Sequence, residues 1–214
     1  MRGPGFLVKH ITNARILAFG YSGERVSNDD WERLYSSGSW KRLETAAEAG
    51  RYSIIVGYCE VLQKKSILDV ACGHGVLAER LKRLNYEKYL GIDVSAVAIN
   101  EASTGHPDDR NRYLVAQAEE FSTDEHFDVI IFNECINYFD DPIAVVTRYL
   151  PFLNPSGHVL VSMYDTVRSR AAWKLLERAM SPADSFNIAH MSSLSWTVKL
   201  MVPLLAENND AKHE

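Results

Sequence analysis

The strongest constraint on the fold is a glycine-rich turn that joins an apolar strand to a helix. Residues 66–75 read Ser-Ile-Leu-Asp-Val-Ala-Cys-Gly-His-Gly, so an apolar run passes the acidic Asp69 and enters a tight turn at Gly73 and Gly75. Glycines let the backbone approach a ligand without a Cβ in the way. A second apolar run ends on Asp93, 18 residues after Gly75. This layout is typical of a βαβ unit that binds a nucleoside beyond the carboxyl ends of its strands.

Apolar strands and helices alternate from residue 66 onward. The segment 127–133 is almost continuously apolar, as a strand buried on both faces should be. The alternation predicts an α/β fold with a doubly wound, mainly parallel sheet covered by helices on both faces. The predicted helices of this part are 75–84, 95–103, 141–151 and 167–180. The predicted strands are 66–71, 88–93, 112–117, 127–133, 157–164, 186–191 and 195–203.

The last two predicted strands, 186–191 and 195–203, are separated by only a few residues. A parallel pair needs a crossover of a dozen or more residues, so these two strands should form an antiparallel hairpin. The sequence therefore predicts a parallel sheet that is finished by one reversed strand.

The first 64 residues read as loop and helix. Helix 27–35 begins with capping residues and acids at its positive end, and a longer helical stretch runs from 43 to 62. We therefore expect two parts: an N-terminal helical cap or lid at residues 1–64 and a ligand-binding core at residues 65–214.

Composition and charge exclude several classes of protein. The chain has 214 residues with a net charge of −5, and its Lys and Arg are not clustered as a nucleic-acid site requires. Three scattered cysteines give no disulfide framework and no metal-ligand pattern. No apolar run is long enough to span a bilayer. We expect a cytoplasmic protein with no metal, no nucleic-acid partner and no membrane partner, as a monomer or homodimer.

The N-terminus leaves a second localisation open. Residues 1–23 contain Arg2, Lys9 and Arg15 and no acidic residue, with apolar residues between them. This pattern mildly resembles an organelle transit peptide, although an ordinary N-terminal helix can have the same composition.

Several motifs in register resemble those of class I S-adenosylmethionine-dependent methyltransferases. The resemblance covers roughly residues 50–202. It implies a seven-stranded Rossmann-like sheet of order 3-2-1-4-5-7-6 with strand 7 antiparallel. It also implies S-adenosylmethionine as cofactor, S-adenosylhomocysteine as product and a small-molecule methyl acceptor. The motifs are the glycine-rich segment 67–75, the ribose motif 91–95, the adenine-contacting loop 117–121, the fourth motif 127–134 and the turn 153–157.

The resemblance also implies roles for individual residues. Gln117 departs from the acid often found at its position, but an amide can still hydrogen-bond adenine. The methionine end of the cofactor would be held by Asp69, Ala71, Gly73, Gly75, Asn133 and Arg51. The ribose and adenine would be held by Asp93, Val94, Ser95, Gln117, Ala118 and Glu119, with Tyr35 and Trp40 closing over the cofactor from the lid.

The acceptor and the catalytic base are less constrained by the sequence. Positioning an acceptor near an activated methyl group can supply most of the rate effect, and a general base helps when the acceptor is a hydroxyl or a protonated amine. The candidate catalytic residues are Glu134, Tyr138 and His190, with His74 as a weaker candidate. The Asn-Pro-Pro-Tyr or Asp-Pro-Pro-Tyr motif of amide and base N-methyltransferases is absent, which favours a small-molecule acceptor such as a natural-product or sugar intermediate. We expect O-methylation slightly ahead of N-methylation.

Three alternatives stay open. Residues 73–78 also match the G-x-G-x-x-A pattern of NAD-dependent dehydrogenases, although here the first glycine does not directly follow the strand. A methyltransferase-like enzyme could instead catalyse a cyclisation. A non-catalytic subunit could bind the cofactor and lack an acceptor pocket.

Overall fold

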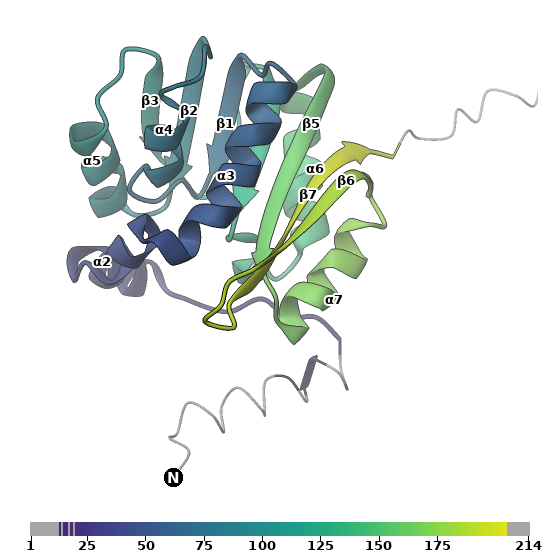
Figure 1. The fold of residues 1–214 in the computed structure, drawn as a ribbon. Coiled ribbons are helices and arrows are strands. Elements are labelled where there is room, and N and C mark those ends of the chain that lie inside the picture. Colours follow the sequence, from purple (N-terminus) through teal and green to yellow (C-terminus); the bar gives the residue numbers. More distant parts are fainter. Residues whose placement is uncertain (1–12, 14, 17, 19, 205–214) are drawn as a thin grey trace, which may run out of the picture.

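The protein folds around one sheet, whose strands are β1 (Ser66–Val70), β2 (Lys88–Asp93), β3 (Asn111–Val115), β4 (Phe127–Asn133), β5 (Leu153–Tyr164), β6 (Met180–Ala189) and β7 (Ser195–Pro203). The structure is a computed structural model that describes residues 13, 15, 16, 18 and 20–204. The strand order is β3-β2-β1-β4-β5-β7-β6 (Figure 1). β7 is antiparallel to β5 and to β6, and the other neighbouring pairs are parallel. The predicted α/β fold and strand order are therefore confirmed.

Helices cover both faces of this sheet. Figure 1 shows the long helix α3 in front of the strands and α6 behind them. Among the residues that the structure describes, no helix is long and apolar enough to cross a membrane. The α-helices are α2 (Asn28–Ser36), α3 (Ala46–Val61), α4 (Val76–Leu81), α5 (Ala96–Gly105), α6 (Pro142–Tyr149) and α7 (Val167–Leu176). The described residues also form three short 3₁₀ helices: η1 (Ser39–Glu44), η2 (Ile136–Tyr138) and η3 (Leu150–Phe152).

The core consists of two apolar layers, one on each face of the sheet. Successive side chains of a strand point to opposite faces, so Leu68 packs in one layer and Ile67 in the other. The layer that contains Leu68 is completed by α6 and α7, for example by Val146 and Leu176. The layer that contains Ile67 is completed by α3 and α4, for example by Ile55. Burial on both faces explains why the central strands read as continuous apolar runs.

The N-terminal helices begin and end at residues that suit those positions. The Ser27 side chain accepts a hydrogen bond from Asp30 N at the start of α2. Gly38, at φ 70°, turns the chain after α2. The predicted helix 43–62 is divided, because Thr45 has an extended backbone between η1 and α3.

One predicted boundary near the carboxyl end differs from the structure. The predicted helix 167–180 ends at Leu176, and β6 begins at Met180 rather than at residue 186. Pro182 signals a break in the sequence pattern, but β6 is an edge strand with a register shift between Pro182 and Asp184. An edge strand tolerates a proline because one row of its N–H groups needs no partner in the sheet.

Candidate active site

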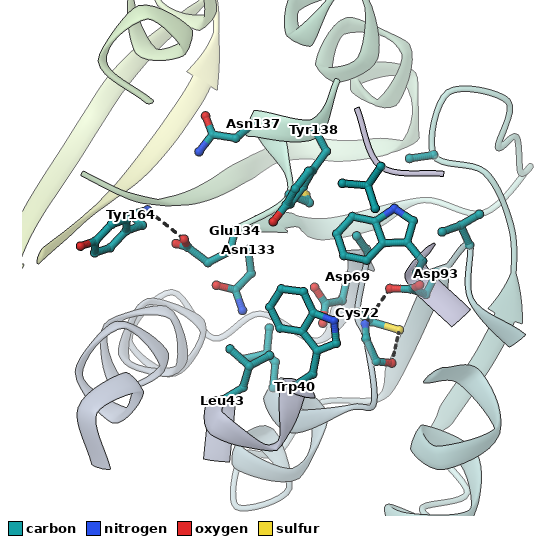
Figure 2. Close-up of a pocket in the computed structure, with 18 of the residues that line it drawn as sticks. Trp40, Leu43, Asp69, Cys72, Asp93, Asn133, Glu134, Asn137, Tyr138 and Tyr164 are labelled. Atoms are coloured by element: carbon teal, nitrogen blue, oxygen red, sulfur yellow. Dashed lines mark hydrogen bonds between the residues drawn. The ribbon is translucent and has the colours of Figure 1, made fainter. Parts of the chain in front are cut away.

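A cavity of about 710 Å³ opens at the carboxyl ends of the parallel strands. β1, β2 and β4 each contribute residues where they end, and α2, η1 and α3 contribute residues from the N-terminal segment. Figure 2 shows Asp69, Cys72 and Asp93 on one side of the cavity, Tyr164 and Asn137 on the other, and Asn133 between them. The position follows from the topology, since the carboxyl ends of parallel strands meet at one edge of a sheet.

The turn after β1 forms the floor of the cavity. Ala71 (φ 57°) and Gly73 (φ 57°) both have left-handed backbone conformations, and both line the cavity. Gly75 (φ 85°) is the N-cap of α4, and a Cβ there would lie 2.9 Å from His106 Cδ2. The conformation at Gly73 and Gly75 therefore favours glycine, which explains the motif physically.

Asp69 is a buried carboxyl group with one unused oxygen. Its Oδ2 accepts a 2.6 Å hydrogen bond from the Tyr89 hydroxyl. Among the described residues, its Oδ1 has no hydrogen-bond partner. Burial raises the pKa of Asp69 to about 7, and the hydrogen bond from Tyr89 offsets only part of that effect. A cation or donor in the cavity would find an acceptor at Oδ1.

Asp93 ends β2 and organises the neighbouring backbone. Its Oδ2 accepts from Gly73 N at 2.9 Å, and its Oδ1 accepts from Ser95 N at 2.9 Å. Burial raises the pKa of Asp93 to about 6, although the hydrogen bonds from Ser95 and Gly73 lower it. Each carboxylate oxygen has a second lone pair, so Asp93 can still accept hydrogen bonds from a ligand that enters the cavity.

Asn133, at the end of β4, is joined to the N-terminal segment by a buried arginine. The Arg51 side chain is 1% exposed; its Nε donates to Glu48 Oε2 at 2.9 Å, and its Nη1 donates to Asn133 Oδ1. This contact fixes the amide of Asn133 so that its Nδ2 is the donor left for other partners. Arg51 and Asn133 thus present donors at the same place in the cavity.

Glu134 follows Asn133 in a left-handed conformation, with φ 64°. Its Oε1 accepts from Ser162 Oγ at 2.6 Å, and its Oε2 accepts from Tyr164 N at 2.8 Å. Burial raises the pKa of Glu134. The two contacts tie the end of β4 to β5, so Glu134 positions this strand end, while each of its oxygens keeps a second lone pair, as those of Asp93 do.

Aromatic side chains from α2, η1 and η2 line the cavity. The ring centroids of Trp31 and Tyr138 lie 4.9 Å apart in an edge-to-face arrangement, and those of Tyr35 and Trp40 lie 6.0 Å apart. Burial raises the pKa of Tyr138 to about 12. The Tyr138 phenol therefore holds its proton near neutral pH.

The structure brings together most of the predicted site residues. Those that line the cavity are Arg51, Tyr35, Trp40, Asp69, Ala71, Gly73, Asp93, Val94, Gln117, Ala118, Glu119, Asn133, Glu134 and Tyr138. Gly75 is not among the lining residues, and neither is Ser95, which caps α5 by accepting from Ala98 N at 3.1 Å. His190 lies in the turn after β6, with its Nδ1 2.6 Å from Ser192 Oγ. His74 is a buried residue of the turn itself, with its Nε2 3.3 Å from Glu44 Oε1, and it is not among the lining residues.

Sequence reasoning missed the residues at the far end of the cavity. Glu24, Asn137, Tyr164, Arg168 and Trp196 all line it. They belong to a loop, η2 and the ends of β5, α7 and β7, and no short motif links them. The only signal available was the strand order, which brings the end of β5 and the start of β7 to the same edge as Asn133.

Comparison with known proteins defines the class. A family described as "Methyltransferase domain" matches residues 41–199. The chain therefore belongs to this methyltransferase family, and the prediction of a class I S-adenosylmethionine-dependent methyltransferase is confirmed. The nicotinamide-dependent alternative is not supported. The predicted cofactor, S-adenosylmethionine, is that of the confirmed class.

Curated relatives match only part of their own length. The ubiquinone biosynthesis O-methyltransferase of Neisseria meningitidis serogroup C is 29% identical over 144 residues, which are 64% of this chain and 58% of that protein. The mitochondrial enzyme of the same name from Dictyostelium discoideum is 29% identical over 114 residues, 47% of this chain and 36% of that protein. The chain thus spans about half the length of these relatives.

Solved structures share the fold at low identity. N-methyltransferase NodS from Bradyrhizobium japonicum, crystallised with S-adenosylhomocysteine, gives a TM-score of 0.66 at 18% identity and covers 77% of this chain and 92% of that chain. The 1,6-didemethyltoxoflavin N1-methyltransferase of Burkholderia thailandensis gives 0.67 at 15% identity, covering 95% and 91%. These likenesses support the fold.

Proposed function

We propose that this protein transfers the methyl group of S-adenosylmethionine to an oxygen or nitrogen atom of a small-molecule acceptor. The observation that carries the proposal is one continuous cavity with two chemically different ends. The end over β1 and β2 carries Asp69 and Asp93, and the end over β5 and β7 carries Tyr164 and Trp196. A cofactor and an acceptor need two such neighbouring compartments.

The residues of the first end fit S-adenosylmethionine. The unpartnered Oδ1 of Asp69 would accept from the ammonium of the methionine end, while Arg51 and Asn133 would donate to its carboxylate. Asp93 would accept from the ribose hydroxyls, and Gln117 would hydrogen-bond the adenine. When bound, this cofactor supplies an activated methyl group.

The chain itself supplies position and shielding rather than a strong base. Trp31, Trp40 and Tyr138 line the cavity as one group of neighbouring rings, and we infer that they shield the reacting groups from water when both ligands are bound. Glu134 holds the end of β4 against β5 through Ser162. We infer that catalysis depends mainly on holding the acceptor in line, an effect that can be large without a proton-transfer step.

Two observations bear on the acceptor atom. The two curated relatives described above are O-methyltransferases, and their identity to this chain exceeds that of the two N-methyltransferase structures. We therefore favour oxygen as the acceptor atom.

The test is production of S-adenosylhomocysteine from S-adenosylmethionine in the presence of a panel of hydroxylated and amine acceptors. The D93A variant is the control, because loss of the ribose contact should suppress product at low cofactor concentration. Product that depends on one acceptor class supports the proposal. Binding of S-adenosylhomocysteine with no turnover of any acceptor would favour a non-catalytic subunit, and a rearranged product without methyl transfer would favour a cyclase.

A further inference from the structure

The far end of the cavity has a chemistry that cofactor binding does not explain. Figure 2 shows Asn137 and Tyr164 on the opposite side of the cavity from Asp69 and Asp93. The strand order gives the same separation, since β4 and β1 lie between β5 and β2. We call this end the acceptor end; it is lined by Glu24, Asn137, Tyr164, Arg168 and Trp196.

Arg168 brings a positive charge to the acceptor end. Its side chain is only 16% exposed, and its Nη1 forms an ion pair with Glu24. Within the part of the chain that the structure describes, its buried Nε has no hydrogen-bond partner. A guanidinium carries five N–H donors in a planar fork that matches a carboxylate. Arg168 therefore has donor capacity that Glu24 does not use, and because the residue lines the cavity, an anionic ligand group can compete for it.

Asn137 brings an acceptor of fixed orientation. The Ser169 hydroxyl donates its single proton to Tyr164 O, so it must accept the 3.0 Å hydrogen bond from Asn137 Nδ2. This contact settles which end of the Asn137 amide is the oxygen. Asn137 Oδ1 is buried and, among the described residues, has no partner. It can accept from a hydroxyl or N–H of a ligand.

Aromatic rings form the walls between these polar groups. Tyr164 and Trp196 pack with their ring centroids 5.7 Å apart, and both line the cavity. Trp31 and Tyr138 form the wall nearer the cofactor end. Flat aromatic walls favour a planar ligand that can stack on them or meet their edges.

We propose that the methyl acceptor is a planar molecule with a carboxylate, which Arg168 binds, and with a hydroxyl or N–H that donates to Asn137 Oδ1. This inference rests on the proposed function and names its substrate class. A single negative charge is favoured because Glu24 already neutralises part of the guanidinium charge. A dianionic group would meet one arginine and the nearby carboxylate of Glu24.

A matched pair of probes tests the charge preference. 4-Hydroxybenzoate and 4-hydroxybenzamide have nearly the same shape, and only the first is an anion. Saturation-transfer NMR with wild-type protein and saturating S-adenosylhomocysteine should give at least about tenfold tighter binding of the benzoate, as expected for a charge-assisted hydrogen bond. Equal binding of the two probes, or no binding of the benzoate, would overturn the proposal.

Three variants test whether Arg168 causes the preference for benzoate over benzamide. R168Q should reduce the ratio of benzoate to benzamide affinity to about one. R170Q is the control, because Arg170 lies two positions further along α7, is exposed and pairs with Asp165; it should keep the wild-type ratio. E24Q removes the carboxylate that competes for Arg168 and should tighten benzoate binding severalfold. If R168Q does not fold, the affinity of E24Q for the benzoate tests the proposal instead. Unchanged or weaker benzoate binding in E24Q contradicts the proposal.

Calorimetry with S-adenosylhomocysteine, run on the same proteins, separates the two levels of inference. Intact binding of this nucleoside without a benzoate preference overturns the acceptor class alone. If the wild-type protein does not bind S-adenosylhomocysteine, the proposed methyltransferase function is overturned as well.

Discussion

Asp69 is a residue whose burial lowers the stability of the ligand-free protein and favours the binding of a cationic ligand. The residue is 1% exposed, and one of its carboxyl oxygens has no partner among the described residues. The pKa of Asp69 is raised to about 7 by burial, so the ionised form destabilises the ligand-free protein. A cation placed against Oδ1 would recover that free energy on binding. The residue is therefore better explained by a ligand than by the fold.

We predict that D69N raises the thermal stability of the ligand-free protein while weakening S-adenosylmethionine binding. Asparagine keeps an oxygen for the Tyr89 hydroxyl and removes the buried charge. The melting temperature measured at pH 8 should rise by a few degrees, since 1 kcal/mol corresponds to roughly 2–4 °C in a domain of this size. A lower melting temperature with unchanged affinity would mean that Asp69 is a structural residue.

The two raised pKa values also predict how binding depends on pH. Asp69 ionises above about 7 and Asp93 above about 6. A cationic ligand prefers both groups ionised, so affinity for S-adenosylmethionine should fall as pH falls through this range. For a group of pKa about 7 the loss between pH 8 and pH 6 is about tenfold. Calorimetric titrations should show this slope in the wild-type protein and a much flatter one in D69N.

At the scale of elements, α2 is attached to the core through α5. The Glu32 carboxylate accepts from Ala96 N at 2.7 Å and Val97 N at 3.2 Å, and from Ser95 Oγ at 2.8 Å. A carboxylate from one helix thus caps the N-terminus of another, where it also meets the positive end of the helix dipole. The attachment holds Tyr35 and Trp31 over the cavity.

We predict that E32Q loosens α2 and leaves the sheet intact. A glutamine has one acceptor oxygen where the carboxylate uses two, and it carries no charge. A loss of about 1 kcal/mol is expected for a helix cap, which corresponds to roughly fivefold faster amide exchange in α2. Hydrogen exchange followed by mass spectrometry checks this change. E101Q is the control, because Glu101 is an exposed residue of α5 beyond its first turn, and the change removes the same charge away from that helix N-terminus; equal exchange of α2 in both variants would contradict the capping role.

The elements differ in how well the sequence predicted them. β4 was clear because both of its faces are buried, which gives a continuous apolar run. β6 was predicted about six residues too late, because exposed side chains and Pro182 hide an edge strand whose main support is pairing with β7. Local patterns report burial well, and they report strand pairing poorly.

At the scale of the whole molecule, the predicted cap and core share one hydrophobic layer. Tyr52, Ile55, Val56 and Cys59 of α3 pack with β1 and α4 in that layer, and none of them is more than 2% exposed. We therefore propose to place the boundary between lid and core at the start of α3 instead of at residue 64. In our proposal the lid comprises α2 and η1, and α3 belongs to the core.

We predict that truncations on either side of α3 behave differently. Removal of residues 1–45 should leave a protein that unfolds cooperatively but binds S-adenosylmethionine weakly, because Tyr35 and Trp40 are lost. Removal of residues 1–64 should prevent folding, since each buried Ile or Val contributes about 1.5–3 kcal/mol against a total stability of about 5–15 kcal/mol. Thermal denaturation monitored by circular dichroism distinguishes the two. Cooperative unfolding of the shorter chain would show that α3 is dispensable.

The site was predictable where a motif reports backbone geometry. Asp69, Gly73 and Asp93 follow from a local turn and two strand ends, so their spacing in the sequence is informative. Arg168 and Asn137 line the same end of the cavity because η2 and α7 are packed together, with Asn137 donating to Ser169. Such convergence depends on tertiary packing, and no spacing in a single sequence encodes it.

The most direct test of the central proposal is calorimetric titration of the purified protein with S-adenosylmethionine, S-adenosylhomocysteine and NAD. We predict that the first two bind at a single site and that NAD does not bind. Absence of binding by both sulfur-containing nucleosides would contradict a methyltransferase function and would leave the likeness as one of fold alone.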